Sequence, residues 1–270
     1  MKNILESPFI IEIIRTTANM YRLGWDERNS GNISLLLDEK EIEEYLDTGA
    51  VKKTFPVNFD AKVLAGKYFL VTGTGKYFKN IQFEPEENLG ILRVSTDGKA
   101  TQLLWGFSSG GSPTSEFSVH LMCHIARLKV NPANKIIMHA HPTNLLAMTF
   151  VHSIDEREFT RTLWQLCIEG ILVFPEGIAV LPWMLCGTEE IAETTAKKMG
   201  VFRLVVWAQH GVFAAGTTLD EAFGLIETTE KAAEIHIKTM HIPRIIVPDV
   251  QITALAEKWR VNYRKDWLQS

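Results

Sequence analysis

The most informative stretch of this sequence is residues 136–142, Ile136-Ile137-Met138-His139-Ala140-His141-Pro142. The apolar run is typical of a buried β-strand, and the proline after it predicts the start of a helix. Because alternate side chains of a strand share one face, His139 and His141 can converge on one ion. Taken alone, however, an H-x-H pair favours two histidines that are satisfied by the core or by solvent over a metal site.

Short β-rich runs and helical patterns alternate around this stretch, which predicts an α/β protein. Strands are expected at residues 33–37, 68–72, 91–95, 101–105, 135–139, 171–174, 203–207 and 212–214. Helices are expected from the cap at Ser7-Pro8 to Gly24, after the capping box at residues 218–221, and near residues 252–262. Residues 39–60 are charged and irregular and are interpreted as a surface excursion, so we expect one domain over residues 1–270.

Composition excludes several classes of protein. With 28 basic and 32 acidic residues the net charge is -4, and no Lys/Arg run offers the positive surface that nucleic-acid binding requires. No segment is typical of a signal peptide or of a membrane span. Cys123, Cys167 and Cys186 lie far apart and are expected to be reduced core thiols. We expect a cytoplasmic protein without nucleic-acid or membrane partners, and an anionic small molecule is compatible with this charge.

A third histidine has the same setting as the first pair. His210 follows the apolar run 203–207 and precedes Gly211. Three neutral imidazoles that leave one coordination position open are what a catalytic zinc requires. His120 and His124 also lie four residues apart on an expected helix, but for them the helix-face interpretation is favoured over a ligand pair.

Glu116 ends a loop that contains Pro113, Thr114 and Ser115. By itself, an acid here is best explained as a cap that complements the dipole of the following helix. The functional alternative is a carboxylate that moves protons beside a metal, with the two hydroxyl groups and free backbone N–H groups holding an anion.

Two glycine-rich stretches, residues 29–32 and 72–76, border expected strands and can present N–H groups to a phosphate, although each alone is only a turn. Neither matches a nucleotide-binding fingerprint. Residues 106–110 do match the G-x-S-x-G motif of serine hydrolases. That motif needs a helix directly after the serine, whereas Gly110, Gly111 and Pro113 intervene here, so a serine hydrolase is disfavoured.

Taken together, the stretches 24–32, 71–76, 113–116, 139–141 and 210–211 resemble the class II aldolase and adducin family, over nearly the whole chain. The resemblance implies that His139, His141 and His210 bind one Zn²⁺ per subunit and that Glu116 is the acid/base residue. It also implies a site for the substrate phosphate formed by Asn29, Gly31, Asn32, Gly73, Thr74, Thr114 and Ser115. Thr74 departs from the serine expected there but retains the hydroxyl. Glu169 resembles an acid that reaches a neighbouring subunit's site.

The family's fold has three layers, with a central, mainly antiparallel sheet flanked by helices, and assembles as a homotetramer. The implied activity is zinc-dependent retro-aldol cleavage of a ketose 1-phosphate. Other activities of the family are alternatives: an aldolase for a different sugar, an epimerase or a dehydratase. A non-catalytic, adducin-like interaction module without metal is the alternative from another class.

Overall fold

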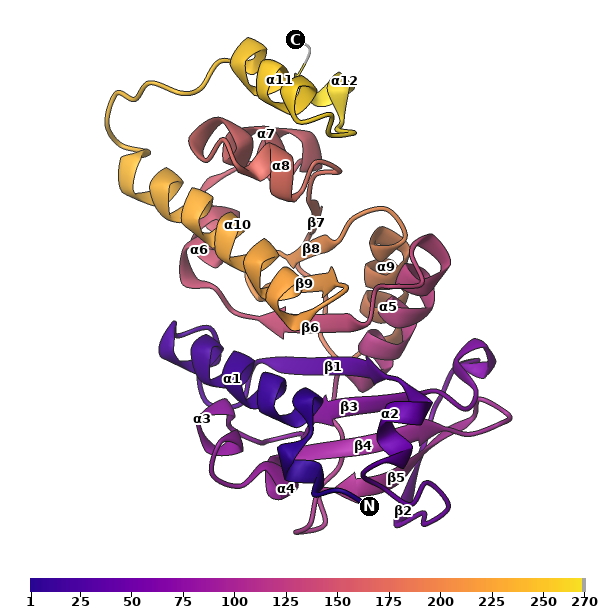
Figure 1. The fold of residues 1–270 in the computed structure, drawn as a ribbon. Helices are drawn as coiled ribbons and strands as arrows, with labels where there is room; N and C mark the ends of the chain where they lie inside the picture. The colour runs from indigo at the N-terminus through magenta and orange to yellow at the C-terminus, as the bar shows by residue number, and fades with distance from the viewer. Residues whose placement is uncertain (269–270) are drawn as a thin grey trace.

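The computed structural model describes residues 1–268, and one nine-stranded sheet runs through them (Figure 1). The strand order is β2-β5-β4-β3-β1-β6-β9-β8-β7. Neighbouring strands pair antiparallel except β7 and β8, which are parallel. The strands are β1 (Asn32–Leu37), β2 (Lys53–Pro56), β3 (Tyr68–Thr72), β4 (Leu89–Val94), β5 (Ala100–Gly106), β6 (Ile136–Ala140), β7 (Ala179–Leu181), β8 (Leu204–Trp207) and β9 (Gly211–Gly216). The predicted mainly antiparallel sheet is confirmed.

Helices cover both faces of this sheet, which gives the predicted three layers. Helices α1 and α10 pack on one face, and α5 and α9 pack together on the other. The helices are α1 (Pro8–Arg22), α2 (Glu39–Glu43), α3 (Phe78–Ile81), α4 (Pro85–Asn88), α5 (Phe117–Val130), α6 (Thr143–Val151), α7 (Glu156–Leu166), α8 (Gly170–Val173), α9 (Glu189–Met199), α10 (Leu219–Thr239), α11 (Asp249–Lys258) and α12 (Lys265–Leu268). Short 3₁₀ turns occupy Ile4–Glu6 and Lys62–Leu64.

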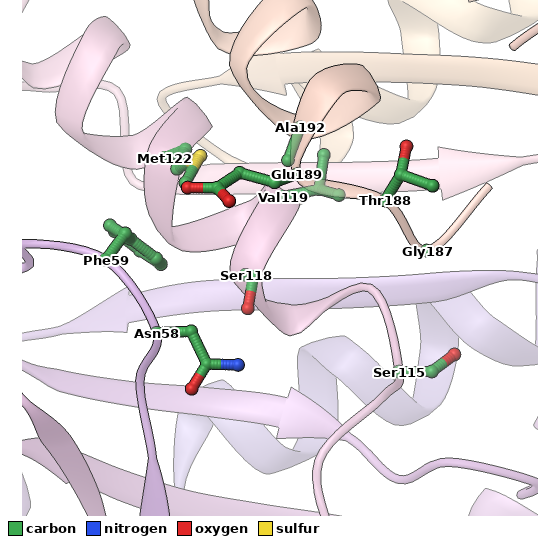
Figure 2. A pocket seen from close by; sticks show the side chains of 10 residues that line it. All are labelled: Asn58, Phe59, Ser115, Ser118, Val119, Met122, Gly187, Thr188, Glu189 and Ala192. Carbon is green, nitrogen blue, oxygen red and sulfur yellow. The ribbon is translucent and has the colours of Figure 1, made fainter. Parts of the chain in front are cut away.

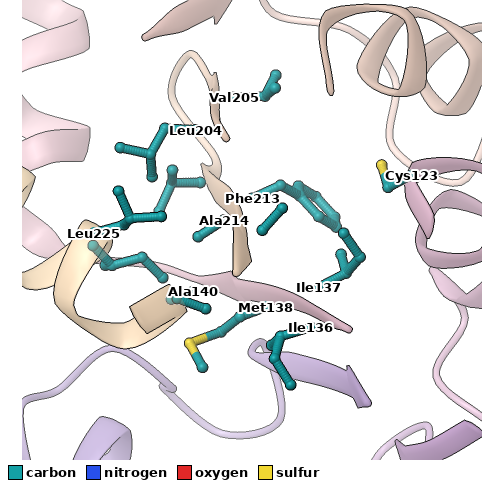
Figure 3. Packing of buried hydrophobic residues seen from close by; sticks show 14 of the residues in the cluster. Cys123, Ile136, Ile137, Met138, Ala140, Leu204, Val205, Phe213, Ala214 and Leu225 are labelled. Carbon is teal, nitrogen blue, oxygen red and sulfur yellow. The ribbon is translucent and has the colours of Figure 1, made fainter. Parts of the chain in front are cut away.

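Strand alternation decides which residues meet which helices. On β1, Ile33 and Leu35 belong to the core under α1, whereas Ser34 faces α5 and hydrogen-bonds its side chains. The same alternation holds on β6, where Ile137 lies beside Phe213 of β9 and toward α5 (Figure 3). A strand buried on both faces reads as a nearly continuous apolar run, which is the pattern that indicated these strands.

Two of the expected helix starts are confirmed. The Ser7 side chain accepts a hydrogen bond from the backbone N–H of Ile10, and the Thr218 side chain accepts one from that of Glu221. These bonds satisfy N–H groups that a helix leaves unpaired in its first turn.

Other expectations were wrong. Residues 171–174 form helix α8 and its cap rather than a strand, because a four-residue apolar run fits a buried helical turn equally well. The excursion at residues 39–60 contains α2 and the edge strand β2. Of the three cysteines expected in the core, only Cys123 is buried there, and Cys186 is exposed. No helix among the described residues is long and apolar enough to cross a membrane.

Candidate metal centre

Three histidines meet at the ends of neighbouring strands in the middle of the sheet. His139 is the penultimate residue of β6, and His141 directly follows the strand. His210 lies in the turn between β8 and β9, and β9 neighbours β6 in the sheet. One ring nitrogen from each lies within 4.8 Å of the other two. His139 is fully buried, while His141 and His210 are half-buried, so the cluster lies at the border between core and solvent.

The orientation of two of these rings points to a cation. The Nδ1–H of His139 donates to the carbonyl of Val212 (3.1 Å), and the Nδ1–H of His141 donates to Glu27 Oε1 (2.7 Å). These bonds assign the hydrogens to Nδ1, so both Nε2 atoms carry lone pairs. The two Nε2 atoms are nevertheless 3.2 Å apart. Two lone pairs repel at this distance unless a cation lies between them.

The spacing also fits a metal ion. Two imidazole nitrogens bound tetrahedrally to zinc at about 2.0–2.1 Å lie about 3.3–3.4 Å from each other. The observed separation of 3.2 Å is close to this value. His139 and His141 therefore fit a divalent cation at their observed spacing, and His210 lies near enough to join them.

Burial keeps two of these ligands, His139 and His210, neutral. Burial lowers the pKa of His139 well below its ordinary value and lowers the pKa of His210 to about 4. A metal binds the unprotonated imidazole, so both nitrogens are available at neutral pH. Burial alone would raise the pKa of Glu27, but its hydrogen bond to His141 outweighs burial and holds the pKa below its ordinary value. Glu27 thus remains a carboxylate that orients His141.

The turn that carries His210 tolerates little change. A Cβ atom at Gly211 would lie 2.7 Å from the carbonyl oxygen of Ala140 and from ring atoms of His139 and His141, so only glycine allows this approach. The residue before His210, Gln209, has a φ of 65°, in the left-handed region. Its N–H donates to Thr149 Oγ1 at 2.9 Å, which ties the turn to α6.

Glu116 lies beside the histidines at the start of α5. Its Oε2 is 3.6 Å from His139 Nε2 and accepts a hydrogen bond from Asn32 Nδ2 at 2.8 Å. Burial raises the pKa of Glu116, and the bond from Asn32 opposes that rise. Glu116 occupies the N-cap position but its side chain makes no capping bond. The helix-cap interpretation therefore does not account for it.

The sheet register brings these groups together. Asn32 of β1 is directly opposite His139 of β6, and His139 is directly opposite Phe213 of β9. Residues opposite each other in an antiparallel pair share a face. Asn32, His139 and Phe213 therefore form one row on the face toward α5, where Glu116 lies.

Backbone contacts connect two of the loops predicted to bind phosphate. The N–H of Thr74 donates to the carbonyl of Ser112, and the N–H of Thr114 donates to that of Thr72, each at 3.0 Å. The side chains of Thr74 and Ser115 are exposed, whereas Thr114 is buried. Thr74 is thus held beside the segment that leads to Glu116.

Asp26 joins the remaining glycine-rich loop to this region. Its Oδ1 accepts from the N–H of Gly31 (2.7 Å), and its Oδ2 accepts from the N–H of Phe78, which follows the 72–76 loop (3.2 Å). Burial raises the pKa of Asp26 to about 6, although both backbone bonds act in the opposite direction. The bond to Asp26 fixes Gly31, so the loop that carries Asn29 and Gly31 is held beside Asn32. The N–H of Gly73 donates to the carbonyl of Asn88 at 2.8 Å.

Glu169 does not join this cluster. It is exposed at the start of α8, and within residues 1–268 it makes no hydrogen bond or ion pair with the histidines or Glu116. A separate pocket of about 150 Å³ lies between the starts of α5 and α9 (Figure 2). Of the predicted site residues only Ser115 lines it, so the pocket is distinct from the metal centre.

Sequence reasoning missed the residues that support this site. Asp26 and Glu27 belong to a stretch that carried the family resemblance, but no role was assigned to them. Ser34, His120 and His124 form a buried hydrogen-bonded chain that ends on Asn32. The i, i+4 spacing of the two histidines was the available signal, and it was interpreted as a helix face.

The chain is similar to known proteins over most of its length. The family model described as Class II Aldolase and Adducin N-terminal domain matches residues 11–237. A rhamnulose-1-phosphate aldolase of Listeria monocytogenes is 55% identical over 100% of this chain and 99% of its own length. One of Enterococcus faecalis is 51% identical over 99% of this chain and 96% of its own. A sugar-phosphate aldolase of Thermotoga maritima has a solved structure that superposes with a TM-score of 0.75 and 33% identity, covering 87% of this chain and 96% of that one.

Proposed function

The chain belongs to the class II aldolase and adducin family, and from this premise we propose that it cleaves L-rhamnulose 1-phosphate to dihydroxyacetone phosphate and L-lactaldehyde. The observation that carries the proposal is the convergence of three imidazoles with a buried carboxylate 3.6 Å from one of them. An adducin-like module that only binds partners has no use for such a centre. The full-length relatives support the substrate.

The three histidines hold the cation, with His139 and His141 binding through Nε2. A divalent ion at this position supplies Lewis-acid polarisation of the substrate carbonyl and stabilises negative charge next to it, worth several kcal/mol. The half-buried edge of the cluster at His141 and His210 gives the sugar access.

Glu116 moves the protons. Retro-aldol cleavage takes a proton from the C4 hydroxyl when the C3–C4 bond breaks, and the three-carbon product gains a proton at C3. Glu116 is close enough to the metal centre to exchange both, and burial raises its pKa toward the range useful for an acid/base group. Asn32 holds its carboxylate through one amide hydrogen.

The substrate phosphate binds to the loops beside Glu116. The residues are Asn29, Gly31, Asn32, Gly73, Thr74, Thr114 and Ser115. The hydroxyls of Thr74 and Ser115 are exposed, and with the side-chain amides of Asn29 and Asn32 they suit an anion without needing a positive net charge. The backbone N–H groups of Gly31, Gly73, Thr74 and Thr114 are already bonded within the protein. Lys76 is paired with Glu87 at 3.4 Å and is not required for this binding.

The remaining parts of the proposal concern the assembly. We infer that the ion is zinc, one per subunit, because three imidazoles with an open position suit it. The chain acts as one domain in a cytoplasmic homotetramer. Glu169, exposed on this chain, contributes to a neighbouring subunit's site.

A cleavage assay with metal exchange tests the proposal. Purified protein is given L-rhamnulose 1-phosphate, and dihydroxyacetone phosphate is measured with a coupled dehydrogenase. Chelation should abolish product formation and added Zn²⁺ should restore it. Full turnover by metal-free protein would contradict the scheme.

The products separate this activity from its relatives. Cleavage of L-fuculose 1-phosphate in preference to L-rhamnulose 1-phosphate would change the substrate but not the reaction. Inversion at one carbon of a pentulose phosphate, without cleavage, would indicate an epimerase. A protein purified without metal and inactive on every sugar phosphate would favour the non-catalytic module.

A further inference from the structure

A buried chain of hydrogen bonds extends from Glu116 into the protein. Asn32 donates to Glu116 from Nδ2, and its Oδ1 contacts His120 Nε2. His120 Nδ1 is 2.7 Å from Ser34 Oγ, and Ser34 Oγ is 2.8 Å from His124 Nε2. Ser34, His120 and His124 have no exposed surface, and α5 carries both histidines over β1.

The hydrogens in this chain have one consistent direction. Because Asn32 uses its amide nitrogen on Glu116, its Oδ1 must accept, so His120 carries its hydrogen on Nε2. His120 Nδ1 then accepts from the Ser34 hydroxyl, whose oxygen in turn accepts from His124 Nε2–H. Each group donates toward Glu116.

The far end of the chain supports the same direction independently. His124 Nδ1 is buried and has no hydrogen-bond partner among residues 1–268. If the hydrogen were on Nδ1, a donor would be orphaned in the core, which proteins tolerate less than an orphaned acceptor. The ring hydrogens therefore receive the same positions whether they are assigned from Glu116 inward or from His124 outward.

We propose that His120 and Ser34 are positioning residues, which fix the Asn32 amide so that its N–H groups face Glu116 and the substrate. An isolated asparagine amide can rotate by 180° and present its oxygen instead, which would repel the carboxylate. The donor on His120 excludes that rotamer. The second amide hydrogen of Asn32 meets only a long contact to the carbonyl of Ser30 (3.5 Å), so it is available to the substrate.

A ligand pair is a poorer explanation of these histidines. His120 and His124 share the Ser34 hydroxyl, so their facing nitrogens are already bonded. Burial lowers the pKa of both, to about 3 for His124, so both are neutral, as the chain of donors requires. Phe69 packs against the ring of His124 and Phe213 against that of His120, so each imidazole is bordered by an aromatic ring.

Three variants test the proposal, which rests on the proposed aldolase activity. Ser34→Ala and His120→Leu break the chain, and we expect kcat to fall about 10- to 100-fold, as for other groups that orient a functional side chain. Metal content should stay at one ion per chain. His120→Gln keeps a donor near the position of Nε2 and should recover most of the lost kcat. Equal losses in the glutamine and leucine variants would overturn the proposal.

Thr160→Val is the matched control. Its hydroxyl is fully buried and, like that of Ser34, has two partners, the N–H and carbonyl of Ile178, but it lies outside the chain. It should lose stability without a comparable fall in kcat. If Thr160→Val and Ser34→Ala lower kcat alike, the effect of Ser34 is general destabilisation and the inference fails.

A double-variant cycle shows whether the chain acts through Glu116. In a Glu116→Gln background, His120→Leu should have little further effect on kcat, because the group it positions is already changed. An undiminished effect in that background would contradict the proposed direction.

Imidazole ¹⁵N resonances give a readout that does not depend on activity. In the zinc-loaded protein, His120 and His124 should both be neutral Nε2–H tautomers, and Ser34→Ala should perturb both. An Nδ1–H tautomer of His120 would overturn the inference. A protein without aldolase activity but with these tautomers would instead refute the proposed function and leave the chain intact.

Discussion

Histidines gather in two neighbouring regions of this molecule, the metal centre at the ends of neighbouring strands and the pair His120 and His124 inside α5. Phe213 contacts His139 in one region and His120 in the other. In the metal centre, two Nε2 atoms face each other with no hydrogen between them. In the pair, His120 Nδ1 and His124 Nε2 both hydrogen-bond the hydroxyl of Ser34. The residue type is the same, and His139 is as buried as His120 and His124, so the difference lies in the hydrogen bonds. Ring nitrogens that face each other without a shared partner indicate ligands, and ring nitrogens that share a hydroxyl indicate positioning residues.

The largest effect is expected from removing a ligand in the first region. His139→Ala should abolish metal binding and lower cleavage by about 10⁴-fold or more, because several kcal/mol of charge stabilisation leave with the ion. Metal content by elemental analysis and kcat/KM are the measurements. His124→Leu, in the second region, should keep its metal. If both variants lost metal equally, the two regions would not differ in the way described here.

The next largest effect concerns the acid between the two regions. Glu116→Gln should lower kcat about 10²- to 10⁴-fold, the range for removal of a general acid/base group, while metal content stays unchanged. Single-turnover kinetics with the zinc-loaded protein checks this. Near wild-type turnover in the variant would assign the proton transfers to another group.

A pH titration tests Asp26, a buried carboxyl group whose hydrogen-bond partners are backbone N–H groups of the protein. The pKa of Asp26 is raised to about 6 in the folded state, so the folded protein binds more protons than the unfolded chain between about pH 4 and pH 6. Its contribution to the free energy of unfolding should therefore fall as pH rises through this window, by about 3 kcal/mol in total. Asp26→Asn should remove this decline.

The measurement is denaturant unfolding of wild type and variant at pH 4, 5, 6 and 7, at the same ionic strength. The difference between their free energies of unfolding isolates the contribution of Asp26, because the contributions of the other groups cancel. A difference that grows with pH would mean that the pKa of Asp26 is lowered on folding and that its two backbone bonds outweigh burial.

The smallest effect is expected from the carboxylate that orients His141. Glu27→Ala removes the partner of Nδ1, and metal affinity should fall about 10- to 100-fold with the ligands still in place. Competition with a chromogenic chelator measures this affinity. Glu27→Gln keeps an oxygen acceptor and should lose less, so equal losses would show that charge rather than orientation matters.

The sequence predicted the parts of this structure that depend on local pattern. The strands around His139 and His210 follow from apolar runs, and the starts of α1 and α10 follow from capping residues. The meeting of His139, His141 and His210 was implied by the family resemblance, and strand alternation alone indicated only that His139 and His141 can share a face.

Other features depend on contacts between distant segments. The opposition of Asn32 and His139 is a matter of register, which no local pattern states. The short apolar run at residues 171–174 became a helical turn because its buried side chains pack against neighbouring helices. His120 and His124 were interpreted as a helix face because their partner, Ser34, lies 86 and 90 positions away.

The row of Asn32, His139 and Phe213 has a practical consequence for anyone who purifies this protein. A slip of one residue between β1 and β6 would turn the partner of Glu116 to the opposite side of the sheet, and a slip between β6 and β9 would separate His139 from the turn that carries His210. A chain with the second error cannot retain its ion. The molar ratio of metal to polypeptide in a preparation is therefore a lower bound on the fraction of correctly assembled molecules, and it can be measured before any substrate is added.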